Sequence, residues 1–133
     1  MSIMETSGEY RASRSAEKGI VLVNLEYRGT MDGPSDVRVY LSIDGKSDDR
    51  SWRSQEGDLD AIAKAINFMF PHRTVVVGYR VTTKGTGTNA VAHAAIVMRD
   101  ENGKTYIGEG EHPKTMIASV IAYIDALNKL KSA

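Results

Sequence analysis

The 133-residue sequence contains no cysteine, no long hydrophobic run and no excess of either charge. Without cysteine it can form neither disulfides nor a thiolate nucleophile nor a zinc site with cysteine ligands. Its 17 basic and 17 acidic residues balance, which argues against binding to nucleic acid or an anionic membrane. Because a spanning helix and a signal peptide both need longer apolar runs, we expect a small cytoplasmic protein of one domain.

Catalytic and metal-binding motifs are also scarce. The three histidines, His72, His93 and His112, stand at no metal-ligand spacing, so we expect no metal site. No serine lies in a G-x-S-x-G turn, and Ser119 lies in a helical pattern, where its hydroxyl is expected to bond a backbone carbonyl. The glycine-rich segment 84–88 joins two strands and is followed by no helix, which argues against phosphate binding. We expect no cofactor.

The chain begins with a polar segment and continues as strands and helices. Residues 1–18 are rich in Ser, Glu and Arg, and we expect a disordered tail or linker there. From residue 19 apolar and polar residues alternate, which predicts strands, until the apolar spacing becomes helical. The expected strands lie near 19–27, 37–43, 51–54, 74–83, 90–99 and 106.

Two amphipathic helices are predicted from apolar residues spaced three or four apart. The first starts after Asp58, which is placed to cap it, and stops before Pro71. The apolar stripes are Leu59, Ile62, Ile66 and Met69 in the first helix, and Ile117, Val120, Ile121, Ile124 and Leu127 in the second.

A single offset of 58 residues aligns the two halves of the chain, for example Asp44-Gly45-Lys46 with Asn102-Gly103-Lys104. Both dipeptides predict hairpin turns. We therefore expect an α+β fold of two pseudo-symmetric βββα units, with antiparallel sheets packed with two helices. The units are expected at about 19–72 and 73–131. Open sheet edges and remaining apolar surface favour a homodimer.

Glycines mark the junction between the last strand and the helix of each unit. Gly108-Glu109-Gly110 precedes the second helix, and Gly57 stands at the matching place before the first. Glycine there permits either a tight bend or a close approach of two backbones. Each helix start leaves N–H groups that an anion could bind, although such groups are often only capped.

The second half also carries motifs of a known family. They are Gly78-Tyr79-Arg80-Val81, Gly87-Thr88-Asn89-Ala90, Gly108-Glu109-Gly110 and Ala118-Ser119-Val120-Ile121-Ala122-Tyr123-Ile124-Asp125-Ala126-Leu127-Asn128-Lys129-Leu130. With these motifs the sequence resembles the C-terminal regulatory (allosteric) domain of 2-isopropylmalate synthase and of the related citramalate synthase. The likeness covers about residues 20–131 and is weaker in the first unit.

This resemblance implies a feedback sensor. In the family the domain binds the end product of the pathway, leucine for isopropylmalate synthases and isoleucine for citramalate synthases, and restrains a separate catalytic barrel. The chain is too short for a barrel, so we expect a fragment or free-standing subunit without synthase activity. The effector-binding residues carried over from the family are Gly57, Leu59, Asp60, Ile62, Val76, Tyr79, Ala90, Ala92, Pro113 and Thr115.

The chemistry of these residues suits a zwitterion. The effector carboxylate would bind near the helix N-termini at Gly57 and Pro113, and its ammonium near carbonyls or Asp60. Leu59, Ile62 and Val76 are expected to pack in the core whether or not an effector binds.

Three alternatives stay open. Residue types do not separate leucine from isoleucine, because one methylene changes binding by only about 1–3 kcal/mol. The domain could also be a purely structural dimerisation module without an effector. A protein of a different class, a small enzyme, would use Tyr79, His93 or His112.

Overall fold

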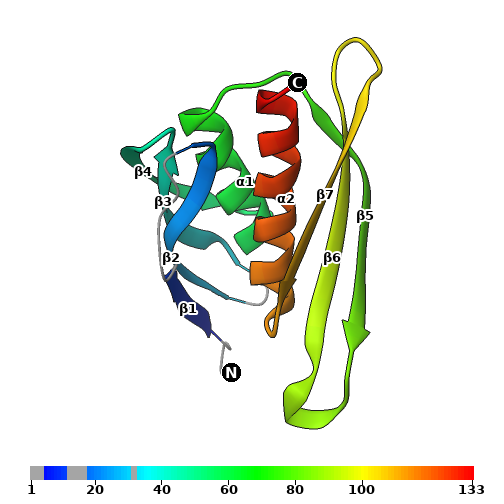
Figure 1. Ribbon diagram of the computed structural model, residues 1–133. Coiled ribbons are helices and arrows are strands. Elements are labelled where there is room, and N and C mark those ends of the chain that lie inside the picture. Colours follow the sequence, from blue (N-terminus) through cyan, green and yellow to red (C-terminus); the bar gives the residue numbers. More distant parts are fainter. Residues whose placement is uncertain (1–4, 12–17, 31–32) are drawn as a thin grey trace. The chain divides into compact units, whose positions relative to one another are not determined.

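The protein consists of two compact units, with the boundary between Pro71 and His72. The structure is a computed structural model that describes residues 5–11, 18–30 and 33–133. In each unit an antiparallel sheet is followed by one helix that lies on a face of that sheet (Figure 1). The predicted α+β fold of two βββα units is therefore confirmed.

The two sheets differ by one strand. The first unit has the strand order β1-β2-β3-β4 and helix α1, and the second has the order β5-β6-β7, a short 3-10 helix η1 and helix α2. The bounds are β1 (Glu5–Arg11), β2 (Ile20–Thr30), β3 (Ser35–Ile43), β4 (Lys46–Ser54), α1 (Asp58–Met69), β5 (Val75–Lys84), η1 (Gly87–Asn89), β6 (Val91–Arg99), β7 (Thr105–His112) and α2 (Thr115–Lys131).

Strand β1 corrects the expectation that residues 1–18 form a disordered tail. Residues 5–11 of that segment pair with the edge of β2 over their whole length. Backbone hydrogen bonds to an open edge can order a polar strand that has little apolar surface to bury. Gly8 makes room for a side chain of β2, because a Cβ there would lie 2.3 Å from the Tyr27 hydroxyl oxygen. Residues 1–4 and 12–17 lie outside the described residues.

The predicted internal repeat relates the elements of the two units. Adding 58 to the bounds of β4 gives 104–112, which differs by one residue from β7. The same shift moves α1 to 116–127, inside α2. The repeat is therefore confirmed, and β1 is an addition to the first unit.

The two hairpin turns are less alike than the repeat predicts. Asp44 and Gly45 form a two-residue turn between β3 and β4, with φ angles of 51° and 84°. Between β6 and β7 the loop has five residues, 100–104, and of the Asn102-Gly103 pair only Gly103 has a positive φ. The Asp100 carboxylate closes this loop by accepting hydrogen bonds from two loop N–H groups at 2.9 Å.

Helix α1 packs small and branched side chains on the first sheet. Ile62 and Ile66 of its predicted stripe are at most 1% exposed, and Ala61 and Ala65 are fully buried beside them. Leu59, expected in the same stripe, is 38% exposed. The buried face is therefore narrower and carries smaller side chains than predicted.

The predicted stripe of α2 is buried at Ile117, Val120, Ile124 and Leu127, and half-buried at Ile121. This helix ends in the C-terminal segment of the chain (Figure 1). Of the helices in the described part of the chain, none is long and apolar enough to cross a membrane.

Helix α2 lies directly on β7 and also covers β6. A Cβ on Gly108 would lie 2.0 Å from the Ala122 carbonyl oxygen, and one on Gly110 would lie 2.4 Å from that of Ala118. The two glycines therefore serve a close backbone approach, one of the two roles expected from the sequence. Strand β5 keeps exposed apolar side chains, which are Val75 at 61%, Val76 at 49%, Val77 at 45% and Tyr79 at 49%.

We expect Gly108→Ala to destabilise the protein by about 1–3 kcal/mol, because the new methyl group would force the α2 backbone away from β7. Urea unfolding followed by circular dichroism measures the loss. Gly78→Ala is the matched control, since its Cβ would meet the Val97 side chain at an ordinary 3.4 Å. Equal losses in both variants would contradict the close-approach explanation.

Candidate functional site

The ten residues expected to bind an effector fall into two groups, one in each unit. The first group lies at the beginning of α1, and the second lies on β5, around the start of β6 and at the beginning of α2. The first group is Gly57, Leu59, Asp60 and Ile62, and the second is Val76, Tyr79, Ala90, Ala92, Pro113 and Thr115.

The residues at the beginning of α1 differ in exposure. Gly57 precedes the helix with a φ of 104°, a conformation that favours glycine, and no side chain caps the helix. The expectation that Asp58 is the cap is therefore wrong, because Asp58 is already the first helical residue. Ile62 belongs to the core as expected, whereas the exposed Leu59 does not and is accessible to a ligand.

Asp60 is held by two neighbouring side chains. Its carboxylate accepts a hydrogen bond from the Ser54 hydroxyl and pairs with Lys64, one helical turn later, at 2.9 Å. The hydrogen bond from Ser54, followed by that from Lys64, lowers the pKa of Asp60 below its ordinary value. Ser54 Oγ also accepts a hydrogen bond from the Glu56 N–H at 3.0 Å, so the network stabilises the connection from β4 to α1. In the sequence, only the four-residue spacing between Asp60 and Lys64 indicated this network.

Val76, Tyr79 and Ala92 lie on the face of the second sheet that carries α2. Val76 pairs with buried Met98 and Tyr79 with buried Ile96, and Ala92 is itself 4% exposed. Val76 and Tyr79 remain half exposed because α2 covers β6 and β7 and leaves β5 largely open. Val76 is therefore not the core residue that we expected. Together with Tyr79 it forms an open apolar strip along β5.

The Tyr79 hydroxyl connects this strip to α2. It lies 2.5 Å from Ser119 Oγ, and Ser119 Oγ donates a hydrogen bond to the Thr115 carbonyl oxygen at 2.9 Å. The bond to Thr115 confirms the expectation for Ser119. Because the Ser119 hydroxyl donates to that carbonyl, Tyr79 is the donor in their pair. Sequence reasoning missed this contact, since the two residues are 40 positions apart.

The other members of the second group lie at chain connections. Ala90 is half-buried after η1, and Pro113 and Thr115 are exposed at the beginning of α2. Helix α2 follows Lys114 without a side-chain cap and has no acidic residue in its first turn, whereas the first turn of α1 contains two aspartates. The positive end of the α2 dipole is therefore less compensated and suits an anion better.

The histidines have structural contacts. Tyr79 and His93, two candidates of the enzymatic alternative, lie on opposite faces of the second sheet, because His93 alternates with buried alanines. His112 Nδ1 accepts a hydrogen bond from the Lys114 N–H at 3.0 Å, and partial burial, followed by the Lys114 charge, lowers the pKa of His112. Among the described residues there is no group of three or more metal-ligating side chains that could hold an ion.

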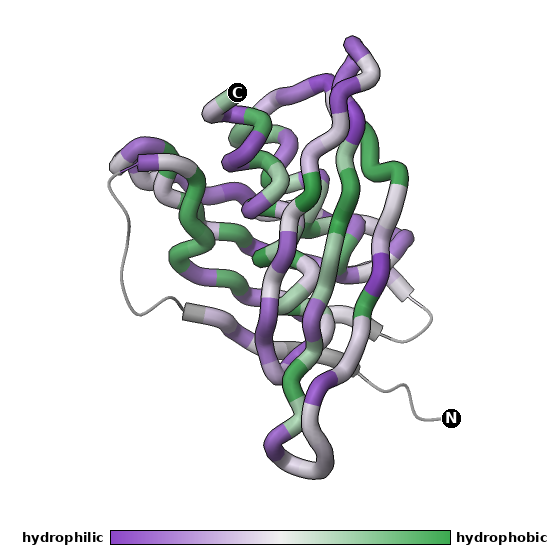
Figure 2. The backbone as a smooth tube through the Cα atoms, turned by 45° about the vertical axis from the view of Figure 1, so that its right-hand side comes forward, coloured by the Kyte–Doolittle hydropathy of each residue, from purple (hydrophilic) through white to green (hydrophobic). Residues whose placement is uncertain are grey.

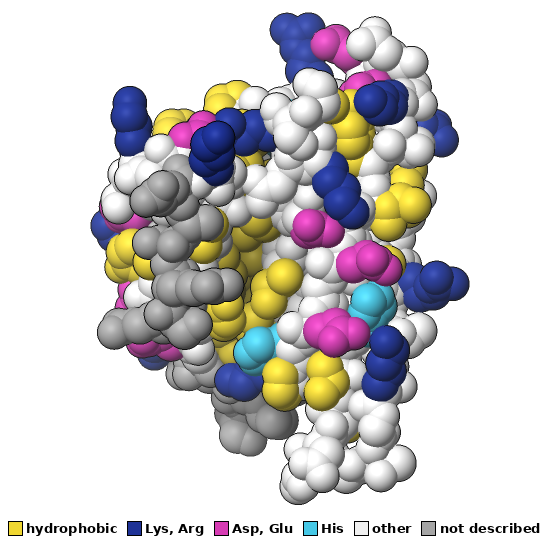
Figure 3. Space-filling view, in the orientation of Figure 1, with side chains coloured by type: hydrophobic (Ala, Val, Ile, Leu, Met, Phe, Trp, Pro, Cys, Tyr) yellow, Lys and Arg dark blue, Asp and Glu magenta, His cyan; other side chains and the backbone are white. Residues whose placement is uncertain are grey.

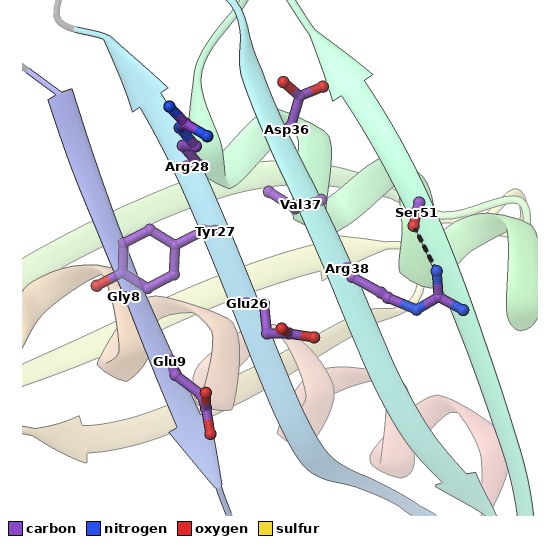
Figure 4. Close-up of a pocket in the computed structure, with 9 residues that line it drawn as sticks. All are labelled: Gly8, Glu9, Glu26, Tyr27, Arg28, Asp36, Val37, Arg38 and Ser51. Carbon is purple, nitrogen blue, oxygen red and sulfur yellow. Dashed lines mark hydrogen bonds between the residues drawn. The ribbon is translucent and has the colours of Figure 1, made fainter.

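A shallow depression of about 710 Å³ lies over the first sheet (Figure 4). Its charged side chains pair across the strands, as Arg38 does with Asp49 and with Ser51 at 3.2 Å, and Glu26 with the Tyr40 hydroxyl at 2.8 Å. Such paired, exposed groups offer little free surface to a small ligand. The described lining contains none of the ten expected residues and consists of Gly8, Glu9, Glu26, Tyr27, Arg28, Asp36, Val37, Arg38 and Ser51.

Comparison with known families agrees with the two-unit architecture. The model of the LeuA allosteric (dimerisation) domain matches residues 6–131, which include strands of both sheets and both helices. The chain belongs to this family. The resemblance to a regulatory domain, expected over about residues 20–131 and strongest in the second unit, is thereby confirmed.

The LeuA-type domain is similar to parts of bacterial 2-isopropylmalate synthases. It is 32% identical over 117 residues to the enzyme of Bradyrhizobium sp. (strain ORS 278) and 31% identical over 116 residues to that of Methylobacterium nodulans. It is 29% identical over 119 residues to that of Methylorubrum populi. These matches cover 87–90% of the chain and 22% of each synthase. The domain thus spans about a fifth of the relatives it matches.

We expect Asp60→Asn to destabilise the LeuA-type domain at neutral pH and to have little effect in acid. The lowered pKa of Asp60 means that its charge contributes stability above the unfolded pKa, near 3.8, and that this contribution is lost as the pH falls through the folded value. Urea unfolding at pH 7, 5 and 3 measures the difference between wild type and variant. In parallel, Ser54→Ala should raise the pKa of Asp60 in a carboxyl NMR titration. A stability difference as large at pH 3 as at pH 7 would contradict this explanation.

Proposed function

We propose that this domain is an amino-acid-binding regulatory and dimerisation module through which leucine inhibits a 2-isopropylmalate synthase-type enzyme. The observation that carries the proposal is the family match over residues 6–131. Because the domain corresponds to about a fifth of each related synthase, the catalytic chemistry belongs to the remaining four fifths. This domain therefore has no synthase activity of its own.

Exposed apolar side chains support a binding role. Leu59 is 38% exposed, and Val76 and Tyr79 are each 49% exposed. Large apolar side chains of this kind are more often buried. Covering a branched aliphatic side chain contributes about 0.8 kcal/mol for each buried CH₂ group. Ala90, half-buried just before β6, has a small side chain that such a ligand could pack against, whereas Ala92 is buried at 4% exposure.

The start of α2 supports an effector that carries a carboxylate. Its first turn has no acidic residue and no side-chain cap, so its N–H groups suit a carboxylate. An amino acid has such a group beside its side chain.

Dimerisation without an effector is the second candidate function. Apolar side chains of β5, together with Ile107 on β7, remain 45–61% exposed in the chain. Exposed apolar surface of this kind favours association whether or not a small molecule binds. Isoleucine in place of leucine is the alternative for the effector itself.

We expect leucine to bind the purified chain with saturable heat in isothermal titration and to raise the midpoint of thermal unfolding. At a leucine concentration 100 times its Kd, binding adds about 2.7 kcal/mol to the free energy of unfolding. Isoleucine, titrated in the same way, should bind more weakly. Stronger binding of isoleucine would instead favour a citramalate-type sensor. Heat from neither ligand in a dimeric chain would favour a structural dimerisation module.

Ala90→Leu should weaken leucine binding at least tenfold, because the larger side chain would take up the room that the proposed ligand needs beside Ala90. Ala63→Leu is the matched control, since Ala63 is also half-buried but lies outside both groups of expected residues. Both variants are titrated with leucine after circular dichroism has verified that they fold. Equal affinities in the two variants would contradict the role given to Ala90.

A further inference from the structure

The face of the second sheet that points away from α2 has an apolar middle. Along β6 the residues Ala92, Ala94, Ile96 and Met98 are buried on the helix side. The alternate residues point to the opposite face, and Figure 2 shows that β6 is coloured apolar along most of its length. On that outer face Val91, His93, Ala95 and Val97 are half-buried.

One exposed apolar side chain of β7 extends this surface. Ile107 pairs with Val97, which in turn pairs with Gly78, so the three form one row across the sheet. Ile107 is 53% exposed. Gly78 adds no side chain, and the row is therefore flat and apolar.

Charges of opposite sign border the two sides of this apolar middle. The outer face of β5 carries Arg80 and Lys84, and the outer face of β7 carries Glu109 and Glu111. His93 of β6 lies between the two carboxylates, at 3.0 Å from Glu111 and 3.3 Å from Glu109. Figure 3 shows a histidine flanked by acidic side chains over this part of the molecule.

Arg80 of β5 and Glu109 of β7 both pair with Ala95 of β6, so they lie level with each other on the outer strands of the sheet. Lys84 already pairs with Glu111 at 3.5 Å. The Arg80 side chain, in contrast, forms no hydrogen bond or ion pair with any other residue in the described part of the chain. Its guanidinium group is therefore available to a partner.

We propose that this outer face packs against the same face of a second copy of the chain, with a two-fold axis parallel to β6. This inference rests on the proposed dimerisation and names the surface that performs it. A rotation about that axis puts β6 over β6 and places β5 of one copy over β7 of the other. Arg80 then faces Glu109 of the partner subunit, twice in each dimer, around an apolar centre.

The charge pattern selects this axis over the other two-fold arrangement of stacked sheets. An axis perpendicular to the strands would put β5 over β5 and bring Arg80 and Lys84 close to their own copies. Like charges across an interface oppose association. Arg99 is exposed at the end of β6 and would lie at the rim, where solvent and salt screen the repulsion between its two copies.

The first test places a charge in the apolar part of the proposed interface. Ile107→Glu should raise the dimer dissociation constant at least tenfold in analytical ultracentrifugation, since it places a carboxylate of each copy against the apolar surface of the other. Phe68→Glu is the matched control, because Phe68 is 54% exposed and lies on α1. An unchanged dimer in Ile107→Glu, or equal weakening in both variants, would overturn the proposal.

A charge exchange tests the orientation without placing a charge in the apolar centre. Arg80→Glu and Glu109→Arg should each weaken the dimer about tenfold or more, because both contacts then join like charges. An equimolar mixture of the two variants should recover a dimer, because every contact in the mixed pair joins opposite charges. No recovery in the mixture would overturn the proposed axis.

The oligomeric state of the wild-type chain distinguishes a failure of the proposed dimerisation from a failure of the proposed surface. A wild-type monomer at all concentrations would overturn both the proposed dimerisation and this surface. A wild-type dimer that none of the outer-face variants weakens would overturn this surface alone. Circular dichroism of each variant distinguishes weaker association from unfolding, and the charge exchange decides the outcome if Ile107→Glu does not fold.

Discussion

Two positions without side chains determine how α2 rests on the second sheet. At Gly108 and Gly110 the helix backbone comes so close to β7 that even a methyl group would overlap it. The contact draws α2 over β7 and β6, and β5 remains largely uncovered. A bulkier residue at either position would push the helix away from β7.

The open strand β5 gives the second sheet two different surfaces. On the helix side, Val76 and Tyr79 form an apolar strip whose hydroxyl end is held by Ser119. On the outer side, a basic β5 and an acidic β7 border an apolar β6. A ligand on the first surface and a second subunit on the other would both bind to the same three strands, so one could affect the other through the sheet.

Much of the fold could be predicted because each element buries one periodic face. Alternation located the strands, and Ile62, Ile66, Val120 and Ile124 marked the helix faces that are buried. The polar residues 5–11 were misjudged, because a strand added to an open edge is stabilised by backbone hydrogen bonds and leaves no apolar pattern. The loop 100–104 was also misjudged, since the Asp100 side chain closes it.

For the site, residue types indicated which positions are small, apolar or charged, but exposure came from packing. Leu59 and Val76 look like core residues in the sequence and are exposed in the protein, whereas Ile62 is buried. Asp60 looks free to bind a ligand but is held by Ser54 and Lys64. The four-residue spacing to Lys64 is visible in the sequence, while the contact with Ser54 is not, because it depends on how the chain turns from β4 into α1.

The sequence by itself determined the repeat of two βββα units, the positions of the helices and the family, because these depend on local periodicity and short motifs. Only the tertiary structure decided that α2 covers β7 and β6 and leaves β5 open, and that Tyr79 reaches Ser119. Such contacts join residues far apart in the chain, and their geometry is set by how closely two backbones can approach.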